Sequence, residues 1–321
     1  MNLQTNIILR KQPNNLIDYN SNLLLLGSCF VEHIGEKLSY FKFKTLQNPF
    51  GILFHSKAIE TLVAKAVAKS QYTEKDIFYH NERWHCFDAH SRLSHTSKDV
   101  LLRDLNNNIS VTTKQLRSTS HIILTLGTAW VYRFLETSAI VANCHKIPQK
   151  QFKKELLSIE TITSSLHYLT DLIKAINPNV VFIFTVSPVR HIKDGFIENT
   201  QGKAHLIAAI HQLLNQQSKT VNSNLHYFPS YEIMMDELRD YRFYAEDMIH
   251  PNTIAVNYIW EKFQSVWLAS ETSKTMEQVD AVQKGLHHKP FSPNSEAHLQ
   301  FLKNIEKRME SLQEQFPHIS F

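Results

Sequence analysis

Residues 23–30 read Leu-Leu-Leu-Leu-Gly-Ser-Cys-Phe, an unbroken apolar run followed by a glycine and two residues with nucleophilic side chains. Such a run, stopped by glycine, is typical of a strand covered on both faces, as strands of parallel sheets are. Residues 121–126 and 180–186 repeat the pattern, and residues 225–228 form a weaker example. The sequence therefore predicts a mainly parallel sheet.

Apolar residues at helical spacing separate these predicted strands. They occur at residues 59–67, where Ser56 is a candidate N-cap, and again at residues 162–176 and 204–214. After Asn252, a second candidate N-cap, the same spacing predicts the last helix of the main domain. The alternation of strand and helix predicts the α/β fold class.

The regions outside this alternation set the expected domain boundaries. Residues 77–90 predict an antiparallel hairpin, which we place in an insertion at about residues 74–97. A polar tail carries a predicted helix at about residues 296–315, which either packs back on the domain or contacts a partner, such as a second copy of the chain. We therefore expect a main domain over residues 1–270 and a helical C-terminal extension over residues 271–321.

The composition argues against several classes of protein. With 43% hydrophobic and 20% charged residues, the 321-residue chain has enough apolar material for a core, which argues against disorder. A net charge of +4, from 34 basic and 30 acidic side chains, is too weak to indicate a nucleic-acid partner. The N-terminus lacks a signal-peptide pattern and no apolar run approaches the roughly eighteen residues of a membrane span, so we expect a soluble cytoplasmic protein. Three cysteines predict free thiols rather than a disulfide framework.

The residues just after the first predicted strand are candidates for catalysis. Gly27 permits a tight turn, and the helix that follows places its positive N-terminal end near Ser28 and Cys29. A thiol gains most from this position, because its pKa falls at a helix N-terminus and the thiolate is its reactive form. The same residues also fit an ordinary strand-to-helix turn with a buried cysteine.

A second candidate lies just before the last predicted helix of the main domain. The three-residue spacing of Asp247 and His250 lets the carboxylate reach Nδ1 of the imidazole, which would leave Nε2 free to act as a general base. The two residues could equally serve only to cap the loop. Because the carboxyl ends of parallel strands meet at one edge of the sheet, this loop and the Gly27 turn could lie together.

Other polar side chains near the predicted strand ends are candidates for binding. Arginines there could bind a carboxylate or phosphate through paired hydrogen bonds, which predicts an anionic substrate, although Asp240 or Glu246 could pair with them instead. The histidines show no zinc-ligand spacing, so we expect no metal and no cofactor. The side chains expected to contact substrate are Thr128, Trp130, His145, Arg190, His191, Arg239 and Arg242.

Several blocks of the sequence resemble one protein family. Gly27-Ser28-Cys29-Phe30-Val31 resembles the signature of the GSCFA family, with valine where the family name has alanine. The resemblance covers roughly residues 20 to 270. It extends over five further blocks in order: Asn48-Pro49-Phe50-Gly51-Ile52, Leu126-Gly127-Thr128-Ala129-Trp130, Asn143-Cys144-His145-Lys146-Ile147-Pro148, Thr185-Val186-Ser187-Pro188-Val189-Arg190-His191, and the segment from Leu238 to Asp247.

The GSCFA family is similar to the SGNH (GDSL-type) hydrolases, which are three-layer α/β/α enzymes that act mostly on esters. The resemblance implies a three-layer, flavodoxin-like α/β/α sandwich with a mainly parallel sheet. In SGNH hydrolases a Gly-Asp-Ser turn supplies the nucleophile, and a late Asp-x-x-His, matched here by Asp247 and His250, supplies the base and its orienting carboxylate. Aligning glycine with glycine makes Cys29 the nucleophile, whereas a shift by one residue makes it Ser28. We favour Cys29, because that register keeps the end of the strand fixed.

The resemblance also implies donors for the oxyanion of a tetrahedral intermediate. It suggests the backbone N–H of the nucleophile and that of Gly51. The larger group then uses an asparagine in a Gly-x-Asn block, where this chain has Ala129. Asn48 and Asn143 are candidate replacements, and each also fits an ordinary turn.

The leading hypothesis is an acyl-ester hydrolase or acyltransferase that forms a covalent acyl-enzyme on an ester or thioester, with an anionic or glycan substrate among the candidates. The alternative is a non-catalytic binding protein that holds an anionic metabolite or glycan in an arginine-rich crevice. The missing asparagine supports this alternative. A peptidase would have no feature of its own beyond the triad.

Overall fold

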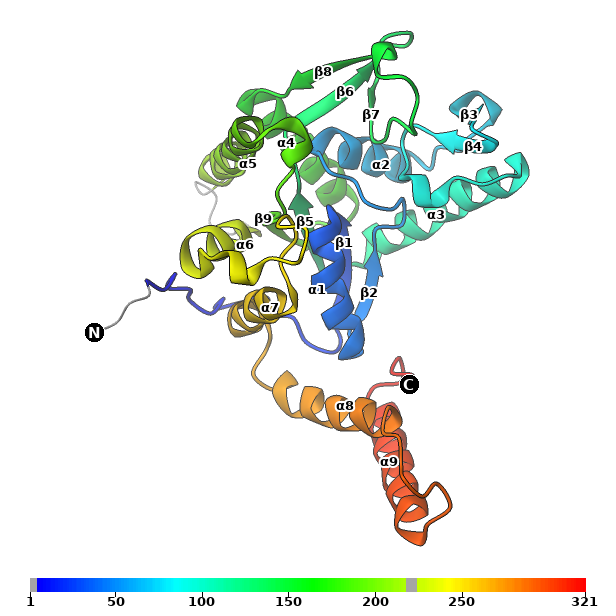
Figure 1. Ribbon diagram of the computed structural model, residues 1–321, viewed down its shortest axis with the longest axis vertical. Helices are drawn as coiled ribbons and strands as arrows, with labels where there is room; N and C mark the ends of the chain where they lie inside the picture. Colours follow the sequence, from blue (N-terminus) through cyan, green and yellow to red (C-terminus); the bar gives the residue numbers. More distant parts are fainter. Residues whose placement is uncertain (1–4, 218–223) are drawn as a thin grey trace.

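The computed structural model describes residues 5–217 and 224–321 (Figure 1). Its centre is a five-stranded sheet in the order β10-β9-β5-β1-β2, in which every neighbouring pair is parallel. The predicted parallel sheet is therefore confirmed. Its strands are β1 (Asn22–Gly27), β2 (Lys44–Gln47), β5 (His121–Leu126), β9 (Val181–Val186) and β10 (Leu225–Tyr227).

Helices cover both faces of the sheet (Figure 1). Side chains alternate along the strands, so that Leu23 and Leu25 belong to a core shared with α1 and α7, whereas Leu24 and Leu26 belong to a core shared with α2 to α5. This confirms the predicted three-layer α/β/α sandwich. The helices are α1 (Cys29–Tyr40), α2 (Ser56–Ala68), α3 (Lys98–Ser118), α4 (Ile159–Ile176), α5 (Phe196–Gln217), α6 (Ser230–Glu232), α7 (Thr253–Trp267), α8 (Thr272–Leu286) and α9 (Glu296–Gln315).

Two small antiparallel sheets lie outside the central one. The predicted hairpin is present as β3 (Ile77–His80) and β4 (Arg83–Cys86). A second sheet, in the order β7-β6-β8, was not predicted. Its strands are β6 (Trp130–Phe134), β7 (Ile140–Val141) and β8 (Phe152–Leu156).

One predicted helix cap is wrong, and two long helices were not predicted. The N-cap of α2 is His55 rather than Ser56, because the His55 ring nitrogen Nδ1 accepts the N–H of Ala58 at 3.1 Å. Helices α3 and α8 were not predicted, because each buries only a narrow apolar stripe among polar residues. The cap at Asn252 is confirmed, since its side chain accepts the N–H of Ala255.

The C-terminal segment packs back on the end of α1 that lies far from Cys29. The hydroxyl of Tyr40 donates to Asp280 at 2.8 Å, and the ring of Phe316 stacks on Tyr19 at 4.9 Å between centroids. Ile319 is buried in the same core as α1. Helices α8 and α9 otherwise extend away from the sheet (Figure 1). In the part of the chain that the structure describes, no helix has the length and apolar character needed to cross a membrane.

Candidate active site

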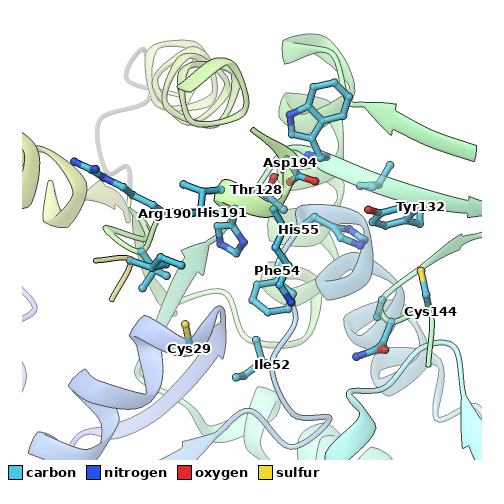
Figure 2. Close-up of a pocket in the computed structure, with 18 of the residues that line it drawn as sticks. Cys29, Ile52, Phe54, His55, Thr128, Tyr132, Cys144, Arg190, His191 and Asp194 are labelled. Atoms are coloured by element: carbon cyan, nitrogen blue, oxygen red, sulfur yellow. Dashed lines mark hydrogen bonds between the residues drawn. The ribbon is translucent and has the colours of Figure 1, made fainter. Parts of the chain in front are cut away.

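A pocket of about 590 Å³ lies at the carboxyl edge of the central sheet (Figure 2). Its walls come from the turn after β1, the segment after β2, the strands β6 and β7, the loop after β9 and the loop before α7. Most lining side chains are apolar, among them Ile52, Phe54, Val131, Val141 and Ile249. The pocket thus occupies the edge at which open α/β sheets bind ligands.

The structure places Ser28 and Cys29 in different environments. Gly27 has a φ of +137°, and a β carbon there would collide with the carbonyl of Thr125, so the turn requires glycine. Ser28 is fully buried and its Oγ has no hydrogen-bond partner. Cys29, the first residue of α1, lines the pocket. Of the two candidate nucleophiles, only the thiol faces the space that a ligand would occupy.

Opposing effects act on the thiol of Cys29. Burial raises its pKa, and the positive charge of Lys203 and the N–H groups of Cys29 and Phe30 partly oppose this effect. The carboxylate of Glu32 adds to the rise. The pKa lies above its ordinary value, so the fall expected at a helix N-terminus is outweighed by burial. At neutral pH the thiol is protonated, and its attack on a substrate requires a base.

Lys203, which was not predicted, lies outside the pocket lining, but its charge affects the pKa of both Cys29 and His191. It lies on α5, is only 2% exposed, and donates from Nζ to the carbonyl of Ser187 at 2.6 Å. Burial lowers its pKa to about 7, against the opposing effect of Cys29. A usable signal was its position on the apolar stripe of α5, in register with the buried residues Leu206 and Ile210.

Asp247 and His250 form the contact expected from their spacing. Nδ1 of His250 lies 2.6 Å from Oδ2 of Asp247, and the other carboxylate oxygen accepts the N–H groups of Ile249 and His250 at 2.9 and 3.0 Å. The two backbone N–H groups and the imidazole lower the pKa of Asp247 to about 2, so its carboxylate stays ionised. His250 also lines the pocket, which brings this loop and Cys29 to one site.

Two of the oxyanion donors suggested by resemblance, Gly51 and Asn48, lie outside the pocket lining, whereas Cys29, whose N–H is the other backbone donor, belongs to it. The N–H of Gly51 donates to the carbonyl of Asn48 at 2.7 Å, and Gly51 lies outside the pocket lining. The side-chain oxygen of Asn48 accepts the N–H of Gly27 at 2.9 Å, so Asn48 supports the turn after β1. Asn143 does line the pocket, while its oxygen accepts the N–H of His145 at 2.8 Å. The first two therefore have structural roles here.

The candidate arginines also differ in whether they line the pocket. Arg190 lines the pocket and lies over the ring of Tyr244 at 4.7 Å. Arg242 lies outside it and pairs with Asp240 at 2.9 Å, which is the ion pair that the sequence left open. Arg239 also lies outside the lining. A single arginine from the predicted group therefore faces this pocket in the described chain.

The remaining predicted contacts divide between the pocket and the neighbouring small sheets. Thr128 and Trp130 line the pocket, and the hydroxyl of Thr128 accepts the N–H of Trp130 at 3.0 Å. His145 is buried outside it, where Nε2 donates to the carbonyl of Cys86 at 2.7 Å. Across residues 5–217 and 224–321, no group of three His, Cys, Asp or Glu side chains could hold a metal ion.

His191 lines the pocket as predicted, but as a neutral ring. Burial, together with the charges of Lys203 and His250, lowers its pKa to about 3. Its Nε2 is buried and has no hydrogen-bond partner. His191 therefore faces the pocket without the positive charge that an anion-binding role would require.

Comparisons with known proteins agree with the sequence blocks. The model of the GSCFA family matches residues 22–263, and the model described as the C-terminal domain of GSCFA domain proteins matches residues 279–321. No curated protein matches the chain. The first match spans the central sheet and the whole pocket. The chain therefore belongs to the GSCFA family.

Proposed function

We propose that this protein is an acyl-ester hydrolase or acyltransferase in which Cys29 is the nucleophile, His250 the general base and Asp247 the group that orients the base. One observation carries the proposal: Cys29 and an Asp247-bound His250 line the same pocket. Ser28 is the weaker candidate nucleophile, because it is fully buried and is not among the residues that line the pocket.

The proposed reaction proceeds in two stages. Nε2 of His250 takes the proton of the thiol as Sγ of Cys29 attacks the carbonyl carbon, which gives a tetrahedral oxyanion. The oxyanion collapses to a thioester on Cys29, and the leaving alcohol or thiol takes the proton from His250. Water or an acceptor hydroxyl then attacks the thioester and gives its proton to His250. As the second oxyanion collapses, the bond between Sγ and the acyl carbon breaks, the acid or the new ester is released, and Sγ takes the proton from His250.

The shape and lining of the pocket suit a substrate with an apolar acyl group joined to a polar or anionic group. Its volume of about 590 Å³ lies within the range of small-molecule sites. The apolar walls suit an acyl chain, and Arg190 is placed to contact a carboxylate, phosphate or glycan hydroxyl. We therefore propose esters or thioesters of apolar acids as the substrate class.

The fold is compatible with membership of the wider SGNH-like group, which we also propose. The central strands follow the order 2-1-3-4-5 when counted within the sheet, as in flavodoxin-like folds, whose ligands bind at the switch point beside the first strand. The turn that carries Cys29 follows this first strand. A triad built there from Cys29, His250 and Asp247 would match the layout that the sequence resemblance implies.

Turnover of p-nitrophenyl esters with acyl chains of two to twelve carbons tests the proposal. We expect activity that increases with chain length, because longer chains bury more of the apolar wall, and we expect Cys29→Ala to abolish it. Retained activity in Cys29→Ala would overturn the assignment of the nucleophile. Binding of acyl glycans or carboxylates without turnover of any ester would favour the non-catalytic alternative.

A further inference from the structure

Three buried polar atoms around the Cys29 turn have no hydrogen-bond partner, namely Oγ of Ser28, Oγ1 of Thr125 and Nε2 of His191. Unsatisfied buried polar atoms are rare in folded proteins, and they often mark catalytic groups whose partner arrives with the substrate. Ser28 and Thr125 are not among the residues that line the pocket, whereas His191 is. His191 is therefore the group whose missing partner a ligand could supply.

We propose that His191 is a catalytic residue that donates a hydrogen bond from Nε2 to the oxyanion formed when Cys29 attacks an acyl substrate. This inference rests on the proposed function and deepens it. It adds a side-chain donor to the backbone N–H of the nucleophile. The other donors that resemblance implies are engaged or missing, because the N–H of Gly51 donates to Asn48, the side-chain N–H of Asn48 donates to Glu32, and Ala129 stands where SGNH hydrolases carry asparagine.

The geometry around Gly127 brings the imidazole to the nucleophile turn. A β carbon on Gly127 would lie 3.0 Å from Nε2 of His191 and 3.2 Å from Cβ of Ser28, so the missing side chain lets these residues approach each other. The ring of Phe54 meets the imidazole edge-on at 5.2 Å between centroids. In Figure 2 the His191 ring lies beside Phe54, on the side of the pocket where α1 begins with Cys29.

The environment of His191 suits a donor rather than an acid or a base. Burial, together with the charges of Lys203 and His250, lowers the pKa of His191 to about 3, so the ring is neutral at neutral pH. A neutral imidazole can donate one hydrogen bond without giving up its proton, and a developing anion selects the tautomer with the proton on Nε2. The backbone holds the ring in place, because the N–H of His191 donates to Asn199 at 2.8 Å.

The proposed step transfers no proton at His191. As Sγ forms its bond to the carbonyl carbon, the electron pair of the C=O double bond moves to oxygen, and the N–H of His191 stabilises that charge inside a largely apolar pocket. When the oxyanion collapses, the electron pair returns, the leaving group departs and the hydrogen bond weakens. Loss of one such donor slows an acyl-transfer step by about 10²- to 10³-fold.

Two reactions at the same thiol separate this role from a structural one. Acylation by a p-nitrophenyl ester passes through an oxyanion, whereas alkylation by iodoacetamide displaces iodide and forms none. Intact-protein mass spectrometry with peptide mapping measures both rates at Cys29. The variants are His191→Phe, which keeps a ring without a donor, and His191→Gln, which keeps an N–H near the same position.

We expect His191→Phe to slow acylation by about 10²-fold or more at saturating ester and to leave alkylation within about threefold of the wild type. His191→Gln should recover most of the acylation rate. We expect both variants to fold, because Nε2 of His191 has no hydrogen-bond partner to lose in the wild type. Thermal unfolding checks this expectation. If the phenyl ring does not fit, His191→Leu repeats the test.

Equal acylation in His191→Phe and the wild type, or an equal fall in both reactions, would overturn the role of His191 and leave the proposed function intact. A wild-type Cys29 that is alkylated but never acylated would overturn the proposed function and this inference with it.

Discussion

Nδ1 of His250 lies 2.6 Å from Oδ2 of Asp247, within a loop in which the same carboxylate also accepts two backbone N–H groups. The loop therefore fixes the carboxylate first, and the carboxylate fixes the imidazole. Nε2 of His250 is left as the free nitrogen on the ring that lines the pocket with Cys29.

Replacement of Asp247 by asparagine should impair the base without removing it. Asparagine can still accept the backbone N–H groups, but it lacks the charge that stabilises an imidazolium on His250. We expect kcat for ester turnover to fall by about 10²-fold or more, with a smaller change in KM. Steady-state kinetics at several pH values measures the change.

The exposed pair of His167 and Asp171 on α4 is a matched control for this experiment. Its Nδ1–Oδ2 distance is 2.8 Å, close to that of the pocket pair, and both residues lie away from Cys29. Asp171→Asn should leave turnover unchanged. A similar loss in both variants would show that Asp247 acts on the fold rather than on the base.

The buried Lys203 should make stability depend on pH. Its pKa is about 7 in the folded protein against an ordinary 10.5, so between these values the unfolded chain binds a proton that the folded protein lacks. The free energy of unfolding therefore rises with pH across this window, and the cost of the buried charge is greatest below pH 7. The difference between the two pKa values limits that cost to roughly 5 kcal/mol.

Lys203→Met should accordingly unfold at higher urea than the wild type at pH 6, and the difference should shrink toward pH 10. Lys193→Met, which changes an exposed lysine beside the same pocket, controls for loss of charge alone and should show no such trend. If the difference in urea midpoint between Lys203→Met and the wild type is the same at every pH, the buried charge of Lys203 is not its cause.

Buried neutral histidines should make the protein sensitive to acid. Burial lowers the pKa of His55 and of His145 to about 4. As pH falls from about 6.5 to about 4, the unfolded chain takes up protons at these rings that the folded protein does not, so stability is lost across this window. Urea unfolding at pH 7 and pH 5 measures the effect. His145→Gln keeps a donor for the carbonyl of Cys86 and should reduce the loss of stability between pH 7 and pH 5. An equal loss of stability in this variant and the wild type would contradict the role of His145.

Loosening the C-terminal segment should leave ester turnover in the pocket unchanged. Phe316→Ala removes the stacking on Tyr19 at the far end of α1, so we expect faster tryptic cleavage near residue 289 and ester turnover within about twofold of the wild type. Phe291→Ala, which changes a fully exposed ring, should alter neither measurement. A large loss of turnover in Phe316→Ala would mean that the tail supports the active site.

Local sequence patterns could predict much of the fold. The run Leu23–Leu26 is apolar on both faces because both sheet faces are covered, and this pattern predicts a buried strand without knowledge of its neighbours. The contact of Asp247 with His250 was predictable for the same reason, since it spans three residues of one loop.

The rest of the site depends on residues that meet only after folding. Lys203 reaches the carbonyl of Ser187 because α5 packs closely against the segment after β5. A β carbon on the neighbouring Gly202 would lie only 3.6 Å from the backbone nitrogen of Ala129 in that segment. Resemblance named Gly51 as a donor, yet only the fold shows that its N–H is already bound to Asn48. The neutral state of His191 likewise results from its burial beside Lys203 and His250.

The most direct test is the mapping of acyl adducts on the wild type, His250→Ala and the control His167→Ala. Each protein is exposed briefly to a p-nitrophenyl ester, quenched in acid and mapped by peptide mass spectrometry, with Cys144 as the internal comparison, because this thiol lines the same pocket. We predict an adduct on Cys29 that forms in the wild type and in His167→Ala and is at least about 10²-fold slower in His250→Ala. An adduct that is absent, that lies on Cys144 alone, or that forms equally fast without His250 would contradict the proposed triad.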